Sequence, residues 1–194
     1  PLVHPSERTL GAVTLVLGIL AWILIVVGTV GIALVYLLLG FLFYLFAHSA
    51  LISWLRGNGV LLSAQQLPDL RERFDACCAK LGLDGDKPEA VLLQGGGALN
   101  AFATRFLGRN YVVLLSDVVD AMDAHPDGVN FYIGHELGHI RRKHLTGKLW
   151  RAPVLWLPLL GAAYSRAKES TCDRHGRACC ESGESASRAL VALA

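Results

Sequence analysis

The feature that most limits how this chain can fold is a long uncharged stretch near its N-terminal end. Residues 9–55, 47 positions in all, contain no Asp, Glu, Lys or Arg, although charged residues make up 18% of the whole chain. A helix needs about 20 apolar residues to cross the hydrocarbon core of a bilayer, so this stretch is too long for one span and suits two. We therefore predict a transmembrane helical hairpin over residues 1–56, with spans at about 10–28 and 32–54 and a turn between them.

Two other interpretations of this stretch fit less well. A buried hairpin in a soluble protein would have to be covered on all sides, and a chain of 194 residues leaves too little sequence to do so. A cleaved signal peptide has an apolar core of only about 7 to 15 residues, followed by a small-residue cleavage site. The lipid bilayer is therefore an expected partner of the chain.

The cations around the predicted hairpin indicate its orientation. Arg8 precedes the first span and Arg56 follows the second, whereas the turn carries no cation, so both ends are expected in the cytoplasm. The five cysteines are odd in number and lack C-x-x-C spacing, which fits free thiols in a reducing compartment. We expect an integral protein of a bacterial inner membrane whose remaining domain faces the cytoplasm. The net charge of +2 gives no reason to expect nucleic acid as a partner.

Residues 57–194 have the mixed pattern of a compact α+β domain. Apolar residues recur at helical spacing over residues 67–81, and short apolar runs at 90–94 and 111–115 predict strands. The glycine-rich residues between these runs predict a turn, a short strand and a second turn. The run Gly95–Gly97 is not followed by the Lys and Ser or Thr of a phosphate-binding loop, so no nucleotide site is expected.

A helix predicted from Gly128 to His144 carries the sequence H-E-x-x-H. His135 and His139 lie one turn apart on the same face, so both rings can point at one metal ion, and Glu136 projects from a neighbouring face. In this motif the two imidazoles bind Zn²⁺, and the glutamate takes a proton from the water that zinc activates. Two structural histidines satisfied by hydrogen bonds are the alternative, because the motif arises by chance in about one in a hundred chains of this composition.

A catalytic zinc site needs a third protein ligand and an open position. One class takes this ligand from a histidine six residues after the second, but Leu145 occupies that position here. His144 is one residue short, and on a continuous helix its side chain points roughly 140° away from that of His139. The third ligand is therefore expected on a later helix, where Glu169 and Asp173 are four residues apart and a second carboxylate can orient a histidine ring.

Together these motifs resemble the membrane-bound zinc metallopeptidases that include HtpX and the type I CAAX prenyl proteases. Their pattern is a membrane hairpin, H-E-x-x-H, a further apolar segment and then S-R-x-x-E-x-x-x-D, which here reads Ser165, Arg166, Glu169 and Asp173. Cys172 stands where the family commonly has alanine. The segment LNAFATRF, residues 99–106, likewise resembles the N-A-F segment that the family places in a small edge sheet before the active helix.

The resemblance implies a mainly helical zincin-like fold with a small edge sheet, and one Zn²⁺ per chain held by His135, His139 and Glu169. It implies that Glu136 is the general base and that Asp173 supports a ligand from the second shell of the site. The implied activity is that of a zinc endopeptidase acting on protein or peptide substrates, which the short strands would hold in extended form by strand addition. Four residues are candidates for stabilising the oxyanion: Asn100, Tyr132, Arg174 and His175.

Residues 152–165 form a second uncharged segment, 14 residues long, between Arg151 and Arg166. The segment is short for a span, so it is expected to be re-entrant or interfacial, next to anionic headgroups. A buried helix beneath a solvated basic face is the alternative.

A function of another class also fits the motif. The chain would then be a non-catalytic membrane scaffold or interaction protein with a structural zinc site. The presence of Glu136 argues against this alternative, because a structural site has no use for a general base.

Overall fold

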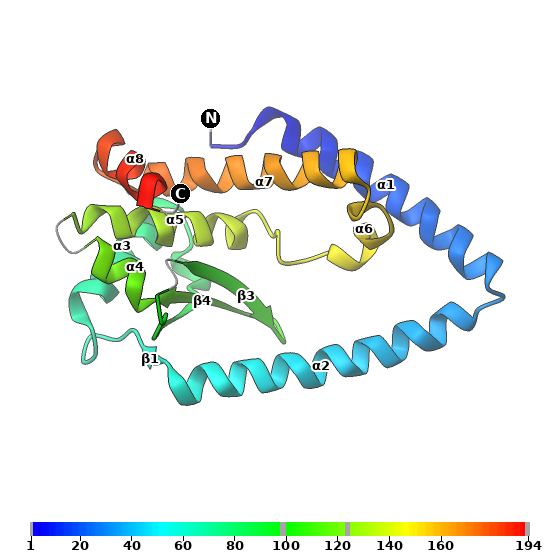
Figure 1. Ribbon diagram of the computed structural model, residues 1–194, viewed down its shortest axis with the longest axis horizontal. Helices are drawn as coiled ribbons and strands as arrows, with labels where there is room; N and C mark the ends of the chain where they lie inside the picture. The colour runs from blue at the N-terminus through cyan, green and yellow to red at the C-terminus, as the bar shows by residue number, and fades with distance from the viewer. Residues whose placement is uncertain (1, 98–99, 123–124, 193–194) are drawn as a thin grey trace.

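The computed structural model describes residues 2–97, 100–122 and 125–192. Two long helices come first, α1 (Pro5–Gly28) and α2 (Ile32–Asn58). The chain reverses between them at Val30 and Gly31, which both have positive φ. Figure 1 shows that α1 and α2 diverge from this turn, and that the sheet and α5 lie in the space between them. Both helices are long and apolar enough to cross a membrane by length and composition, and an 18-residue window in each has a mean hydropathy of 2.8 in α1 and 2.0 in α2.

The remaining described residues form a helical domain around a small mixed sheet. Its strands are β1 (Val60–Leu61), β2 (Glu89–Leu93), β3 (Ala101–Phe106) and β4 (Arg109–Leu115), in the order β1-β2-β4-β3. β2 and β4 are parallel, and the outer pairs are antiparallel. The helices are α3 (Pro68–Lys80), α4 (Ser116–Ala121), α5 (Asp127–Arg141), α6 (Lys148–Leu155), α7 (Pro158–Cys179) and α8 (Gly183–Ala192), with a 3₁₀ turn at Asp84–Asp86. The predicted α+β class is confirmed; Leu99, in the predicted edge segment, lies outside the described residues.

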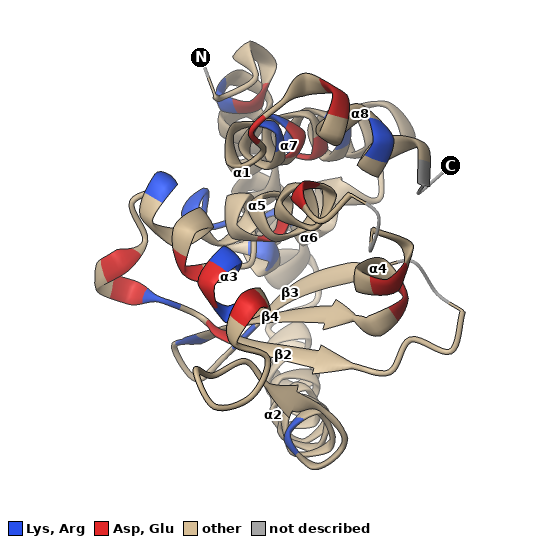
Figure 2. Ribbon diagram, turned by 90° about the vertical axis from the view of Figure 1, so that its left-hand side faces the viewer, with Lys and Arg blue, Asp and Glu red and all other residues tan. Residues whose placement is uncertain are grey.

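The sheet separates two apolar clusters because its side chains alternate between its faces. Tyr111 and Val113 of β4 pack with Ile52 and Leu55 near the end of α2. The intervening strand residues face the main core, to which α3 and α5 contribute. In Figure 2, β3, β4 and β2 follow one another from the side of α5 to the side of α2. The edge strand β3 therefore lies next to the helix that carries H-E-x-x-H.

Helices α5 and α7 approach each other closely because glycines line their contact. A Cβ atom at Gly134 would lie 2.7 Å from the Sγ atom of Cys179, and one at Gly176 would lie 2.7 Å from the carbonyl oxygen of Phe131. These distances leave no room for a side chain at either glycine. The close approach brings the carboxylates of α7 opposite the histidines of α5.

Helix α5 ends at Arg141, three residues before the predicted end at His144. Lys143 adopts a left-handed φ of +57°, and the amide of His144 donates to the carbonyl of His139 at 2.9 Å. These features form a Schellman motif, which stops a helix and turns the chain back over its last turn. The expectation that His144 points away from His139 was therefore wrong, because it required an uninterrupted helix.

Candidate metal centre

Three side chains from two helices converge where α5 faces α7. His135 Nε2 lies 3.3 Å from Glu169 Oε2, and His139 Nε2 lies 3.5 Å from the same oxygen. The Glu169 side chain is half exposed, whereas both histidines are largely covered. Two imidazole nitrogens and one carboxylate oxygen, with solvent on one side, are the donor set of a catalytic zinc site that keeps an open position.

The second nitrogen of each ring already has a partner. His135 Nδ1 is 3.0 Å from Asp173 Oδ1, and His139 Nδ1 is 3.1 Å from His144 Nδ1. These contacts hold both rings with Nε2 directed at Glu169. Metal-binding histidines almost always use their other nitrogen in this way, so the residues present fit a zinc ion.

The electrostatics of the cluster also suit a cation. Burial by itself would lower the pKa of His135, but hydrogen bonds to Asp173 and Glu169 outweigh burial and raise it to about 9. Hydrogen bonds from His135 and His139 hold the pKa of the Glu169 carboxyl well below its usual range. The acidic partners of the two imidazoles thus favour positive charge at this position.

Glu136 lies on the inner side of α5, next to the edge strand. The residue is 8% exposed, and burial raises the pKa of its carboxyl in spite of the nearby imidazoles. The backbone of Ala103 in β3 offers it a hydrogen bond. A carboxylate whose pKa is raised towards neutrality is suited to accept and return a proton.

Comparison with known families agrees with this geometry. The sequence model of peptidase family M48 matches residues 64–160, half of the chain. The chain belongs to peptidase family M48. The resemblance noted in the sequence is thereby confirmed, and so is its class as a metallopeptidase, since peptidases of this family depend on zinc. Searches of curated proteins and of solved structures gave no match.

The M48 match covers H-E-x-x-H but ends before Glu169 and Asp173. The positions of these two carboxylates therefore rest on the geometry of α7 and on the motif that contains them. Both lie on the face of α7 that meets α5, one turn apart.

Cys172 is a further residue of this M48 peptidase at the site, and the sequence marked it only as a departure from the alanine common in the family. Its Sγ atom and ring nitrogens of His135 and His139 all lie within 4.8 Å of one another. The side chain is fully buried, burial raises the pKa of its thiol, and Sγ is also 3.6 Å from His144 Nδ1. Its position three residues after Glu169, on the same face of α7, was the available signal.

Two of the four candidates for stabilising the oxyanion are buried and already hydrogen-bonded, which excludes them from that role. The Tyr132 hydroxyl is buried and donates to the Ala189 carbonyl at 2.7 Å. His175 is 1% exposed, and its Nδ1 atom donates to the Thr171 carbonyl at 2.7 Å. Neither group can reach a substrate. Asn100, exposed at the start of β3, and Arg174, on α7, stay candidates.

Proposed function

We propose that this M48 peptidase is a membrane-anchored zinc endopeptidase that binds one zinc ion through His135, His139 and Glu169. The observation that carries the proposal is the convergence of two Nε2 atoms of α5 on one carboxylate oxygen of α7. Asp173 would hold His135 in the tautomer that presents Nε2 to the metal.

Zinc held there would polarise the scissile carbonyl and make an attacking water acidic near neutral pH. Glu136 would accept a proton from the attacking water and pass it to the leaving amine nitrogen. The burial of Glu136 favours this role because it raises the pKa of the carboxyl. A carboxyl with a raised pKa holds an accepted proton more firmly, so it can carry the proton from the water to the amine.

The edge strand provides a way to hold the substrate. In the described sheet β3 pairs only with β4, so its other edge carries no further strand and is where an extended peptide would add. The hydrogen bond from the Ala103 backbone to Glu136 supports the view that this open edge faces the general base. A peptide added to β3 would therefore pass alongside the residues that cleave it.

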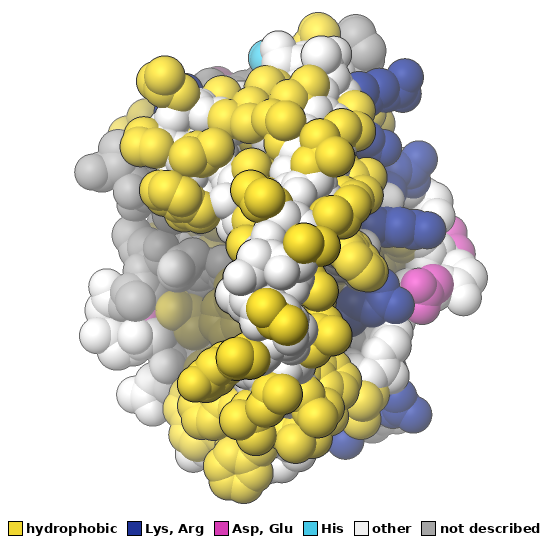
Figure 3. Space-filling view, turned by 90° about the vertical axis from the view of Figure 1, so that its right-hand side faces the viewer, with side chains coloured by type: hydrophobic (Ala, Val, Ile, Leu, Met, Phe, Trp, Pro, Cys, Tyr) yellow, Lys and Arg dark blue, Asp and Glu magenta, His cyan; other side chains and the backbone are white. Residues whose placement is uncertain are grey.

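The exposed surface supports membrane anchoring of residues 1–56. Large apolar side chains stand exposed along both helices, among them Leu20, Leu24, Val27, Leu38 and Phe46. Figure 3 shows a broad apolar surface at the end where α1 and α2 meet, bordered on one side by Lys and Arg. An apolar surface of this extent is unfavourable in water, which favours spans at about 10–28 and 32–54. The cations Arg8 and Arg56 at the outer ends of these spans favour residues 57–194 on the cytoplasmic side of a bacterial inner membrane.

Contacts with α1 favour a re-entrant position for residues 152–165. The Trp22 indole donates to the Leu149 carbonyl at 2.8 Å, and a Cβ atom at Gly18 would lie 2.2 Å from the Trp150 carbonyl oxygen. Helix α6 thus packs against the middle of the proposed first span. The neighbouring Trp156 is 73% exposed, which fits contact with lipid better than a buried helix.

Fractionation of cells that express the chain tests the anchor. Because insertion is hydrophobic, the protein should stay with the membranes in carbonate buffer and in high salt and should be released only by detergent. Recovery of the intact chain in the soluble fraction without detergent would exclude the proposed spans.

The enzymatic proposal is tested with the purified protein in detergent. It should contain about one zinc per chain and digest an unfolded substrate such as casein. A strong chelator should abolish digestion, and added zinc should restore it, because the metal is needed for the reaction. Zinc in the protein without any digestion would favour the scaffold with a structural site instead.

A further inference from the structure

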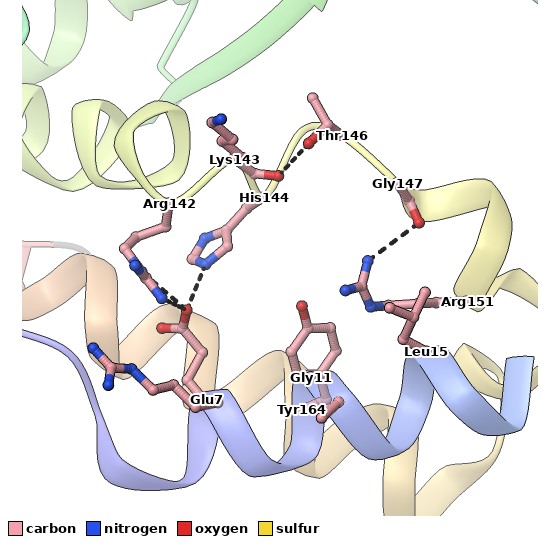
Figure 4. Close-up of a pocket in the computed structure, with 12 residues that line it drawn as sticks. Glu7, Gly11, Leu15, Arg142, Lys143, His144, Thr146, Gly147, Arg151 and Tyr164 are labelled. Carbon is pink, nitrogen blue, oxygen red and sulfur yellow. Dashed lines mark hydrogen bonds and ion pairs between the residues drawn. The ribbon is translucent and has the colours of Figure 1, made fainter.

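A series of hydrogen-bonded side chains connects the candidate metal centre to the first helix. His139 Nδ1 lies 3.1 Å from His144 Nδ1, and His144 Nε2 lies 3.3 Å from Glu7 Oε1. Figure 4 shows the His144 ring directed at the Glu7 carboxylate, which α1 contributes. His144 is 7% exposed and Glu7 is 5% exposed, so water competes little for these contacts.

The roles of the ring nitrogens follow from the metal position, and in this respect the inference rests on the proposed function. If His139 binds zinc through Nε2, its Nδ1 must carry the proton. His144 Nδ1 then has to be the acceptor, which leaves the proton of His144 on Nε2. That proton is donated to Glu7 Oε1, and every nitrogen in the series has one consistent role.

The carboxylate at the end of the series is held firmly in place. Arg142 donates to the same Oε1 atom of Glu7 through Nε at 3.1 Å and through Nη2 at 3.0 Å. The start of α1 is also fixed to α7, because the His4 amide donates to Thr171 Oγ1 at 3.1 Å. Glu7 is the one acidic residue of α1, and burying it is costly unless its partners repay the loss of water.

We propose that His144 and Glu7 are positioning residues of the metal centre. His144 fixes the tautomer and orientation of the ligand His139, and Glu7 fixes those of His144. The first helix then contributes to zinc binding as well as to anchoring. The simpler alternative is that Glu7 only docks α1 through its ion pair with Arg142.

Zinc affinity of the full-length protein in detergent, measured by competition with a chromophoric chelator, separates the two interpretations. His144→Ala should weaken zinc binding about 10- to 100-fold, the usual cost of losing an outer partner, and Glu7→Ala should weaken it about 10-fold. The double variant should bind zinc no more weakly than His144→Ala, because Glu7 acts through His144.

Three further variants test for general effects. His144→Asn should recover most of the lost affinity, because Asn Oδ1 can replace Nδ1 as the acceptor, and in this background Glu7→Ala should have no further effect. Arg142→Ala removes the ion pair that docks α1 but leaves Glu7 to accept from His144, so it should weaken zinc binding less than Glu7→Ala does; equal losses would favour docking alone. Asp75→Asn, a carboxylate paired with Arg71 and Lys87 on another face, is the matched control.

Histidine labelling with ¹⁵N gives a readout independent of affinity. In the zinc-loaded protein, His139 should be protonated at Nδ1 and His144 at Nε2. Protonation of His144 at Nδ1, unchanged affinity in His144→Ala, or additive losses in the double variant would each overturn the positioning role. Failure of the wild type to bind zinc at all would instead contradict the proposed function on which that role depends.

Discussion

Glu136→Gln should lower the rate of peptide hydrolysis by about 10²- to 10⁴-fold, the usual contribution of a general base. The amide has nearly the same shape as the carboxylate but cannot accept the proton of the attacking water. Zinc content should stay at about one per chain, because Glu136 is not among the proposed ligands. Turnover on a fluorogenic peptide and zinc analysis of the same preparation give both quantities.

The control for this variant is Glu72→Gln, which makes the same chemical change at an exposed position on α3. It should have wild-type turnover. If Glu136→Gln also retained full turnover, another group would have to take the proton, and the assignment of the base would be wrong.

Glu169→Ala should weaken zinc binding by more than about 100-fold, beyond the usual cost of losing an outer partner, and should abolish hydrolysis. The reason is the position of Glu169 Oε2, which is the atom that both ligand nitrogens approach. Cys172→Ala is the matched variant, because Cys172 is the other residue of α7 whose ligand atom lies near the two histidines.

Cys172→Ala should leave zinc content and turnover close to those of the wild type. Its buried thiol has a raised pKa and would have to lose its proton before it could bind a metal. A zinc titration of the two variants decides between the ligands. Zinc lost in Cys172→Ala and kept in Glu169→Ala would mean that sulfur, and not the carboxylate, completes the site.

The parts of the fold that depend on local patterns could be predicted from the sequence. The apolar runs at 90–94 and 111–115 form strands β2 and β4, displaced by no more than two residues at either end. The spacing of His135 and His139 was enough to place them on one helical face, because α5 is regular through both. β1 has only two residues and was missed, since no period can be recognised over so short a segment.

The surroundings of the proposed metal ligands could not be predicted in the same way. The end of α5 was missed because Lys143, and not glycine, occupies the left-handed position of the Schellman motif. The contact between Glu7 and His144 joins residues 137 positions apart, and no periodic pattern reports such a pair. An acidic residue in the first turn of a helix also has an ordinary explanation, its favourable interaction with the helix dipole.

The attachment of the start of α1 to α7 has a consequence for how the protein is made. His4 meets Thr171, and Val3 meets Arg174, across 167 and 171 positions of the chain. A ribosome delivers the chain in order at about 5 to 20 residues per second, so α1 emerges well before its partner on α7 exists. Newly made α1 therefore waits for its contacts with Thr171 and Arg174, and the proposed metal centre can form only once translation has passed α7, which carries Glu169.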